Sequence, residues 1–437
     1  MVEFKLRNDP KATPRSGKAS GATFEVILNA EPETRNPEPG TRNSELGTMR
    51  LLETQNLVTN FYTYEGVVNA LNRVSLVVDH GTTFGLVGES GCGKSVFVLS
   101  IMRIVQSPGK IEDGKVLVFF NDDAGATGVD LLRQSEAYMQ RIRGDRISMV
   151  FQEPNAALNP IMTIGDQVAE SFLFHQQKEL CKTVLAELDA PDCQIIRPLK
   201  TLQRAFYGMA AQHPDATALK LCDRVPVLRR WRRPMKRHAL RRAVNIIGKL
   251  GIPNPEEVVS QYPHNLSGGM KQRIVIAIAL ACSPVLLIAD EATSNLDVTI
   301  QAQILNLLKR LKQTEIASIL LITHDLGVVA ETCDRVGVMY AGNLCEVADV
   351  GDLFHHPRHP YTRALLEAVP RLAQEGELKS IEGSVPNLVD PPPGCRFHPR
   401  CPHAMELCRK RFPDQVEVGP NHTVSCYLYT DRPRPEA

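Results

Sequence analysis

The sequence predicts an α/β domain with a parallel central sheet, and three observations support this. Residues 285–289 (VLLIA) and 319–323 (ILLIT) are short, entirely apolar runs, as expected for parallel strands that are buried on both faces. The segment between them, VTIQAQILNLLKRLK, repeats apolar residues at helical spacing. Upstream, the apolar run TFGLV precedes a glycine-rich stretch and a helix-like segment, VFVLSIMRIV. Strands and helices therefore alternate over about residues 49–355, in the pattern of an α/β domain.

The two ends of the chain differ from this domain in composition. Residues 1–48 are polar and contain a short repeat, TRNPEPG followed by TRNSELG, so we expect a disordered extension that cannot offset the entropy of ordering. Residues 337–347 (GVMYAGNLCEV) predict two strands around an Ala-Gly-Asn turn. Beyond Pro357 the sequence becomes rich in Pro, His and Cys, which indicates a small C-terminal module over residues 356–437.

The overall composition excludes several classes of protein. Lys and Arg total 50 against 49 for Asp and Glu, which by itself argues neither for nor against a nucleic-acid or membrane partner. The single Trp and few aromatic residues speak against a binder that stacks nucleic-acid bases, and we expect no nucleic-acid partner. The longest apolar stretch, 274–289, is broken by Ser283 and Pro284 and is too short to span a membrane. The N-terminus lacks the apolar segment of a secretory signal. We therefore expect a soluble cytosolic chain whose eleven cysteines are reduced or bind metal rather than form disulfides.

A phosphate-binding loop is the strongest local signal. The stretch GESGCGKS fits the pattern G-x-x-x-x-G-K-[ST] between a predicted strand and a predicted helix. Its residues are Gly88, Glu89, Ser90, Gly91, Cys92, Gly93, Lys94 and Ser95. The glycines let backbone N–H groups turn inward around an anion at a helix N-terminus. We expect Lys94 to reach the β- and γ-phosphates of a nucleotide and Ser95 to bind Mg²⁺, and we expect no redox role for Cys92.

Two acidic residues follow the apolar run 285–289. Asp290 and Glu291 would lie at the carboxyl edge of the parallel sheet, where ligands bind. Asp290 suits the coordination shell of Mg²⁺, and Glu291 suits the base that activates the attacking water. An apolar run followed by two acids is weak evidence alone, because it also describes a strand that ends in a solvated turn.

The stretch LSGGMKQR, residues 266–273, resembles the signature of the ATP-binding cassette (ABC) family. The resemblance implies that Ser267, Gly268 and Gly269 bind the γ-phosphate of ATP held by an opposite subunit. Two glycines at a helix N-terminus suit this role, because backbone amides and the helix dipole favour an anion there.

Other elements that resemble this family appear in its order. Gln152 in VFQEPNAALNP resembles the family glutamine that contacts Mg²⁺ and water. The stretch SNLD at 294–297 resembles a family loop that spans the dimer interface, which implies that Asp297 lies at that interface. His324, after ILLIT, resembles the histidine that contacts the γ-phosphate. Phe61 or Tyr64 falls where the family has an aromatic residue that stacks on adenine, and a core aromatic is an equally good reading of either.

The C-terminal sequence carries a second resemblance. The segments FHHPRHPYTRALLEAVP and GSVPNLVDPPPGCRFHPRCPHAMELC resemble the end of oligopeptide and dipeptide importer ATPases. Related subunits hold a [4Fe–4S] cluster there, so the resemblance implies that Cys395, Cys401, Cys408 and Cys426 bind one. Their spacing alone leaves zinc, two disulfides and four free thiols as alternatives, in that order.

The chain departs from the family in three places. Ala292 stands where relatives have Pro, and Asn295 stands where they have Ala, but neither change removes a catalytic group. The helical subdomain, about residues 153–265, carries an insertion at about 190–240 that includes VLRRWRRPMKRHALRR. A block of positive charge of this kind is usually a surface exposed to solvent. The alternative role for this insertion is contact with anionic lipid headgroups.

The resemblance therefore implies a P-loop NTPase fold of the ABC type and a peripheral ATPase. ATP and Mg²⁺ would be its cofactors, and Glu291, His324 and Gln152 its catalytic residues. Its partners would be a second ABC ATPase subunit, more readily a different chain than a copy, two transmembrane permeases and an extracytoplasmic solute-binding protein. It would act at the cytoplasmic face of the membrane, with peptides as the default cargo. The alternative is a non-transport ABC ATPase of DNA repair or translation.

Overall fold

An eight-stranded sheet organises the residues that the structure describes. The computed structural model describes residues 49–120, 128–190, 197–212, 232–293, 296–314, 318–369 and 381–430, which belong to one compact unit. The order within the sheet is β11-β12-β10-β9-β3-β8-β7-β6. The parallel strands are β3 (Thr83–Val87), β6 (Ile147–Val150), β7 (Leu286–Asp290), β8 (Ser318–Thr323) and β9 (Arg335–Tyr340). The predicted disordered extension at 1–48 and Trp231 of the basic insertion lie outside the described residues.

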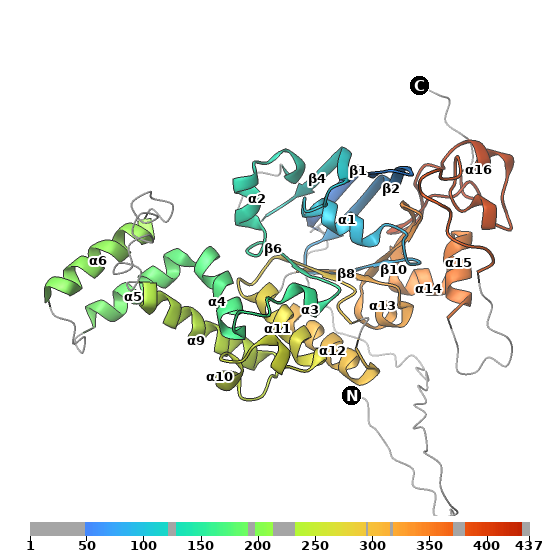
Figure 1. Ribbon diagram of the computed structural model, residues 1–437. Coiled ribbons are helices and arrows are strands. Elements are labelled where there is room, and N and C mark those ends of the chain that lie inside the picture. The colour runs from blue at the N-terminus through green and yellow to red at the C-terminus, as the bar shows by residue number, and fades with distance from the viewer. Residues whose placement is uncertain are drawn as a thin grey trace, which may run out of the picture. The chain divides into compact units, whose positions relative to one another are not determined.

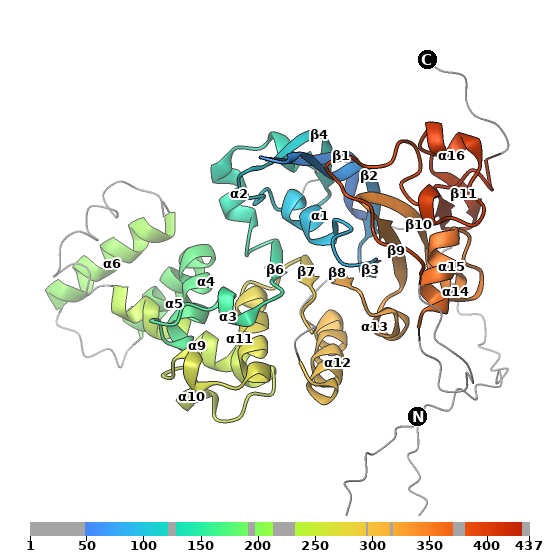
Figure 2. The same ribbon diagram turned by 45° about the vertical axis from the view of Figure 1, so that its right-hand side comes forward.

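The apolar runs seen in the sequence are confirmed as central parallel strands. Alternate side chains of these strands serve two different cores, because successive residues of a strand point to opposite faces. Leu286, Ile288 and Ile322 belong to the core that contains helix α1 (Lys94–Ile101). Leu287 belongs to the core that contains α11 (Gly268–Leu280). The phosphate-loop helix and the signature helix therefore pack on opposite faces of one sheet, as Figure 2 shows.

A second sheet covers the α1 face. Its strands are β1 (Arg50–Thr63), β2 (Gly66–Asp79), β4 (Gly109–Val118) and β5 (Val129–Asp130), antiparallel in the order β2-β1-β4-β5. Leu52, Leu76 and Val116 of this sheet share a core with Phe97 of α1. Helix α2 (Glu136–Ile142) adds Met139 to the same core. Helix α1 is thus enclosed between the two sheets (Figure 1).

Helix α1 is shorter than the sequence predicts. The apolar pattern suggests helix up to Val105, but α1 ends at Ile101. Arg103 takes a φ of 52°, in the left-handed region, through which a right-handed helix of L-residues does not continue.

Helices between β6 and β7 form a layer with α11. The helices of this region are α3 (Pro154–Ala157), α4 (Ile164–His175), α5 (Gln177–Asp189), α6 (Arg197–Gln212), α9 (Arg233–Lys249) and α10 (Pro255–Val258). The hydroxyl of Thr163 caps α4 by accepting a hydrogen bond from the Asp166 amide. On α9, Lys236 and Arg237 form ion pairs with Asp166 and Glu187 at 2.8 and 2.7 Å. Part of the basic surface predicted here is therefore neutralised by acidic neighbours.

The remaining helices follow the parallel strands or lie towards the C-terminus. They are α12 (Val298–Thr314), α13 (Leu326–Thr332), α14 (Val350–His355), α15 (Pro360–Glu367) and α16 (Glu406–Lys410). Among the described residues, no helix combines the length and apolar character needed to cross a membrane.

The C-terminal residues extend the main sheet. The predicted strand pair is confirmed as β9 and β10 (Asn343–Asp349), joined by Ala341 and Gly342 with φ values of 45° and 79°, as a tight hairpin requires. Strand β12 (His422–Val424) then pairs with β10, and β11 (Val416–Gly419) pairs with β12. Residues that the composition separates from the α/β domain thus continue its sheet.

Candidate nucleotide site

The loop from Gly88 to Ser95 connects β3 with α1, in the predicted context. Gly88, Gly91 and Gly93 have φ values of 156°, 77° and 101°, which L-residues with a side chain rarely adopt. A Cβ at Gly93 would lie 2.7 Å from the Ala70 carbonyl oxygen, and one at Gly88 would overlap the Met339 carbonyl oxygen. Two of the motif glycines are therefore fixed by backbone packing as well as by their dihedral angles.

The side chain of Lys94 lies inside this loop. Its ammonium group donates to the carbonyl oxygens of Gly88 at 2.8 Å and Glu89 at 3.1 Å, and the residue is 5% exposed. The Cys92 sulfur lies 3.7 Å from the same nitrogen, and burial raises the pKa of the Cys92 thiol, so the thiol stays protonated. A buried cation surrounded by loop backbone is suited to a polyphosphate.

Ser95 and Asp290 are brought together from α1 and the end of β7. The Ser95 hydroxyl donates to Oδ1 of Asp290 at 3.1 Å. Asp290 is 5% exposed, and burial raises the pKa of its carboxyl; the hydrogen bond from Ser95 opposes this rise and the Glu291 carboxylate adds to it. A hydroxyl and a carboxylate at one point are the oxygen ligands that Mg²⁺ accepts.

Glu291 lies between Gln152 and His324. The Gln152 side-chain amide donates to Oε2 of Glu291 at 2.9 Å, and Nδ1 of His324 lies 3.3 Å from Oε1. Glu291 has a φ of 45°, and its amide donates to the Ile322 carbonyl oxygen on the adjacent strand. Glu291 therefore leaves β7 in a left-handed conformation, of the kind that concentrates at functional sites. Three residues that are far apart in the sequence thus meet at the carboxyl edge of the sheet.

The signature residues do not join this cluster. Ser267 caps α11 by accepting a hydrogen bond from the Met270 amide at 3.3 Å, and Gly269 lies against Ile300 of α12. Asp297 caps α12 through the Ile300 amide at 3.0 Å, and Ser294 and Asn295 lie outside the described residues. α11 and α1 pack on opposite faces of the sheet, so the signature and the phosphate loop belong to helices of two different cores.

The two aromatic candidates have different environments. Phe61 is partly buried on β1 opposite Gly109, where a Cβ on the glycine would lie 2.6 Å from its ring. Tyr64, in the turn between β1 and β2, is fully exposed, so its ring is available to a ligand.

The four C-terminal cysteines line one small cavity. Cys395, Cys401, Cys408 and Cys426 surround it together with residues that include Phe397 and His359. All nine cysteines within the described ranges are free thiols. Those ranges contain no group of three or more His, Cys, Asp or Glu side chains that could hold a metal ion. Burial raises the pKa of the Cys395 and Cys426 thiols to about 12 and about 11.

Sequence reasoning missed two residues that bind the phosphate loop. Arg400 forms an ion pair with Glu89 at 2.9 Å, and the Tyr361 hydroxyl accepts a hydrogen bond from the Glu89 amide at 3.0 Å. Both residues lie in the C-terminal segments that resemble importer ATPases, but each lies more than 270 positions from Glu89. No local sequence pattern carries a signal for such contacts.

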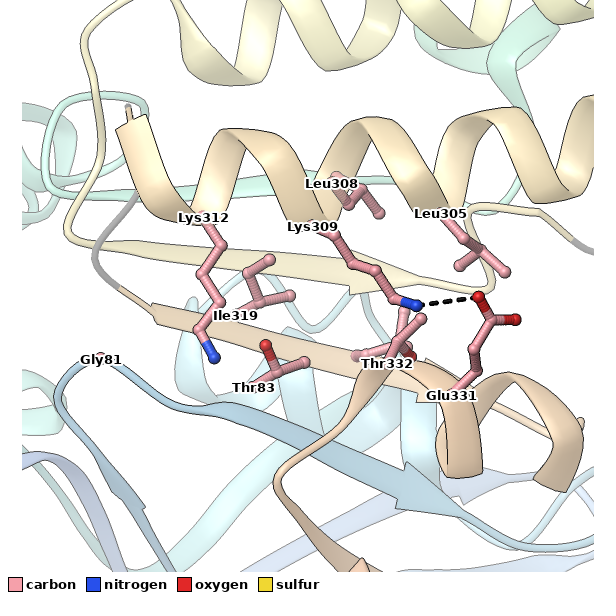
Figure 3. A pocket seen from close by; sticks show the side chains of 10 residues that line it. Gly81, Thr83, Leu305, Leu308, Lys309, Lys312, Ile319, Glu331 and Thr332 are labelled. Atoms are coloured by element: carbon pink, nitrogen blue, oxygen red, sulfur yellow. Dashed lines mark hydrogen bonds and ion pairs between the residues drawn. The ribbon is translucent and has the colours of Figure 1, made fainter. Parts of the chain in front are cut away.

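A second cavity lies away from the phosphate loop, between α12, β8 and α13. Figure 3 shows Lys309 and Lys312 on α12, with Lys309 paired to Glu331 of α13 at 2.8 Å. Lys312 bonds to Asp334 at 2.6 Å. The cavity measures about 600 Å³, within the range of small-molecule pockets, but both lysines that line it are already paired with acids.

Comparison with known proteins agrees with this geometry. Residues 71–294 match the family model described as "ABC transporter", and residues 345–408 match "Oligopeptide/dipeptide transporter, C-terminal region". The dipeptide transport ATP-binding protein DppD of Bacillus subtilis (strain 168) is 42% identical over 88% of this chain and 96% of its own length. The oligopeptide transport ATP-binding protein AppD of the same organism is 41% identical over 87% of this chain and 97% of its own length.

These findings support the transport interpretation and give no support to the alternative in DNA repair or translation. The ABC-type P-loop fold and the ATPase activity expected from the sequence are confirmed. The chain belongs to the ABC transporter family, as one of its ATP-binding subunits.

Proposed function

We propose that this chain powers the import of peptides from the cytoplasmic face of a cell membrane, as the peripheral ATPase of a transporter. The names of its relatives, which are dipeptide and oligopeptide transport ATP-binding proteins, support peptides as cargo. The match over residues 345–408 to a C-terminal region of such transporters supports it independently. The permeases that span the membrane and the binding protein that captures the peptide are other chains.

The contact of Glu291 with both Gln152 and His324 supports the catalytic roles most directly. In our proposal Glu291 accepts a proton from the attacking water, while Gln152 and His324 hold its carboxylate in place. The Lys94 ammonium binds the β- and γ-phosphates after it leaves the carbonyl oxygens of Gly88 and Glu89. The amides of the loop, from Ser90 to Ser95, bind the remaining phosphate oxygens.

Ser95 and Asp290 would hold Mg²⁺, with Gln152 completing the set. Their hydrogen bond at 3.1 Å fits this role, since both oxygens already face the same point. The ion would neutralise charge on the phosphates. Tyr64 would stack on adenine, because its ring is exposed, whereas Phe61 on β1 is partly buried beside Gly109 of β4. Phe61 then has a structural role.

A second ATPase subunit would complete the site. The opposite faces occupied by α1 and α11 support this, because Ser267, Gly268 and Gly269 of one subunit would have to reach the ATP of the other. Asp297 would lie at the contact between the two subunits. The partner is a different ATPase chain in our proposal. Gln152 and the helical subdomain at about 153–265 would transmit closure of the pair to the permeases.

Reconstitution tests this function. Proteoliposomes that contain the chain, its partner ATPase and the permeases, with the binding protein and a labelled tripeptide outside, should accumulate label only with ATP and Mg²⁺ inside. Lys94→Ala in this chain should abolish both hydrolysis and accumulation. Hydrolysis that is stimulated by another solute and never by a tripeptide would disprove the peptide assignment and leave the ATPase assignment intact.

We also propose that Cys395, Cys401, Cys408 and Cys426 bind a [4Fe–4S] cluster. Four thiols around one enclosed cavity are a suitable donor set, because such clusters are held by four cysteine thiolates. Zinc bound by the same four thiols is the second choice. Since burial raises the pKa of the Cys395, Cys401 and Cys426 thiols, cluster binding would release protons. When bound, the cluster would cross-link the chain segments that carry the four cysteines.

Anaerobic purification tests the cluster. Iron and acid-labile sulfide should be present in equal amounts and should be lost in the Cys408→Ser variant. Cys333→Ser, at a thiol outside this cavity, is the matched control and should retain both. Stoichiometric zinc without sulfide, or neither element, would overturn the cluster assignment.

A further inference from the structure

Glu89, the second residue of the phosphate loop, is bound by the C-terminal part of the chain. Its two carboxylate oxygens accept hydrogen bonds from the guanidinium of Arg400 at 2.9 and 3.3 Å. Its backbone amide donates to the hydroxyl of Tyr361 at 3.0 Å. Tyr361 belongs to α15, and Arg400 precedes Cys401 (Figure 1 shows α15 and α16 at the C-terminal end of the colour range).

Hydrogen bonds to groups other than Glu89 also hold the guanidinium of Arg400 in place. It also donates to the hydroxyl of Tyr340 at 3.2 Å and to the carbonyl oxygens of Ile381 at 3.1 Å and Glu382 at 2.8 Å. Its side chain is 7% exposed, and that of Glu89 is 23% exposed. A planar guanidinium whose donors are all directed this way presents a rigid two-pronged surface to a carboxylate. Removal of either partner would leave a largely buried charge unpaired.

Tyr361 is held as firmly as Arg400. It is fully buried, and its ring lies 4.6 Å from that of Tyr340 and 5.4 Å from that of Phe397, measured between ring centroids. The tyrosine hydroxyl therefore has little freedom to move away from the Glu89 amide. Glu89 is therefore held by two groups, the Arg400 guanidinium and the Tyr361 hydroxyl, whose own positions are fixed by their neighbours.

Glu89 also contacts the loop lysine. Its carbonyl oxygen accepts a hydrogen bond from Lys94 at 3.1 Å, so the amide, the carboxylate and the carbonyl of this one residue bind three different groups. A shift of Glu89 would therefore displace an acceptor of the ammonium that is expected to bind phosphate. The loop also contacts the turn between β9 and β10, because the Gly342 amide donates to the Cys92 carbonyl oxygen at 2.8 Å.

We propose that Arg400 and Tyr361 are positioning residues for the phosphate loop, residues 88–95. Through their contacts with Glu89, the C-terminal segment that begins at residue 356 sets the affinity of the chain for ATP. This inference rests on the role proposed above for residues 88–95. It assigns to the C-terminal segment a part in nucleotide binding, although none of its residues belongs to the nucleotide motifs. Loss of the contact should raise the dissociation constant for ATP more than it lowers the turnover rate at saturation, because Glu291, Gln152 and His324 are unchanged.

A double-mutant cycle on the full-length chain tests this directly. Binding of a fluorescent ATP analogue with Mg²⁺ is measured for Arg400→Ala, for Glu89→Ala and for the two together. Each single change should weaken binding about tenfold, in the range of typical coupling between sites. The double variant should bind no more weakly than the weaker single variant, because both changes remove the same interaction.

Three further variants separate positioning from folding. Arg400→Lys keeps the charge but not the two-pronged contact, so it should give an intermediate affinity. Tyr361→Phe removes only the hydroxyl and should weaken binding less than Arg400→Ala. Arg409→Ala, at an exposed arginine beside Cys408, is the matched control and should bind like the unaltered chain. Thermal unfolding of each variant confirms that it is folded at the temperature of the assay.

The outcomes are distinct. Affinity of folded Arg400→Ala within about twofold of the unaltered chain, or effects of Arg400→Ala and Glu89→Ala that multiply in the double variant, would overturn the inference. If the unaltered chain itself fails to bind ATP, the proposed function fails instead.

Discussion

The side-chain amide of Gln152 donates a hydrogen bond of 2.9 Å to Glu291, whose other carboxylate oxygen lies 3.3 Å from Nδ1 of His324. The three residues come from the ends of three neighbouring strands, β6, β7 and β8. Register explains their proximity, because Val150 pairs with Ala289 and Asp290 pairs with Ile322. Residues one or two positions beyond these pairs therefore lie at the same edge of the sheet.

Glu291→Gln should separate binding from hydrolysis. Glutamine keeps the size of the side chain but cannot accept the proton of the attacking water, so turnover should fall by about 100- to 10,000-fold. ATP affinity should stay the same or increase, because Lys94 and the loop are unaltered. Phosphate release and equilibrium binding measure the two effects. Glu256→Gln, at an exposed glutamate on α10, is the control, and equal turnover in both variants would refute the role of Glu291 as base.

Asp290→Asn should stabilise the nucleotide-free chain while it weakens Mg²⁺-dependent hydrolysis. Burial raises the pKa of the Asp290 carboxyl above its unfolded value of 3.8, so the folded state binds protons more tightly than the unfolded state. Stability due to this group therefore falls as pH rises through the window between these two pKa values, and at neutral pH the buried carboxylate lowers the free energy of unfolding. Asparagine removes that cost and can still accept the hydrogen bond from Ser95.

Urea denaturation at several pH values measures this effect. At pH 7 the urea concentration at the midpoint should be higher for Asp290→Asn than for the unaltered chain. The slope of the free energy of unfolding against urea concentration should be the same for both. The difference should shrink as pH approaches 3.8, where the unfolded carboxyl also protonates. A lower midpoint at pH 7 would contradict the burial argument.

Gly88→Ala should damage the loop and the fold together. An added Cβ would overlap the Met339 carbonyl oxygen and lie 2.7 Å from the Cys92 sulfur, at a φ of 156°. We expect a loss of about 1–3 kcal/mol in the free energy of unfolding and no measurable ATP binding. Gly351→Ala, where nothing lies within 4 Å of the new Cβ, is the control. Because Gly351 lies in α14, its replacement should be neutral or stabilising by up to about 1 kcal/mol.

Tyr64→Ala should weaken ATP binding by about fivefold or more, since a base stacked on an aromatic ring contributes about 1–3 kcal/mol. Tyr64→Phe should retain the affinity, because the ring and not the hydroxyl would contact adenine. Phe61→Ala should instead lower thermal stability, since Phe61 packs beside Gly109. An opposite pattern in the ATP titration, with Phe61→Ala weakening binding and Tyr64→Ala without effect, would assign the adenine contact to Phe61.

Local patterns in the sequence determined much of this protein. The apolar runs at β7 and β8 and the turn at Ala341–Gly342 each depend on a few neighbouring residues, so they could be recognised without coordinates. The phosphate loop could be recognised for the same reason, because glycine conformation and a helix N-terminus are local properties. The apolar runs also predicted that Glu291 and His324 follow strands.

Only the tertiary structure decided which distant groups meet. Strand order brought Gln152 to Glu291 across 139 positions, and chain folding brought Arg400 to Glu89 across 311. It also separated α1 and α11 onto opposite faces of the sheet. Contacts of this kind depend on how sheets and helices pack against one another, and a pattern that spans a few residues carries no record of that packing.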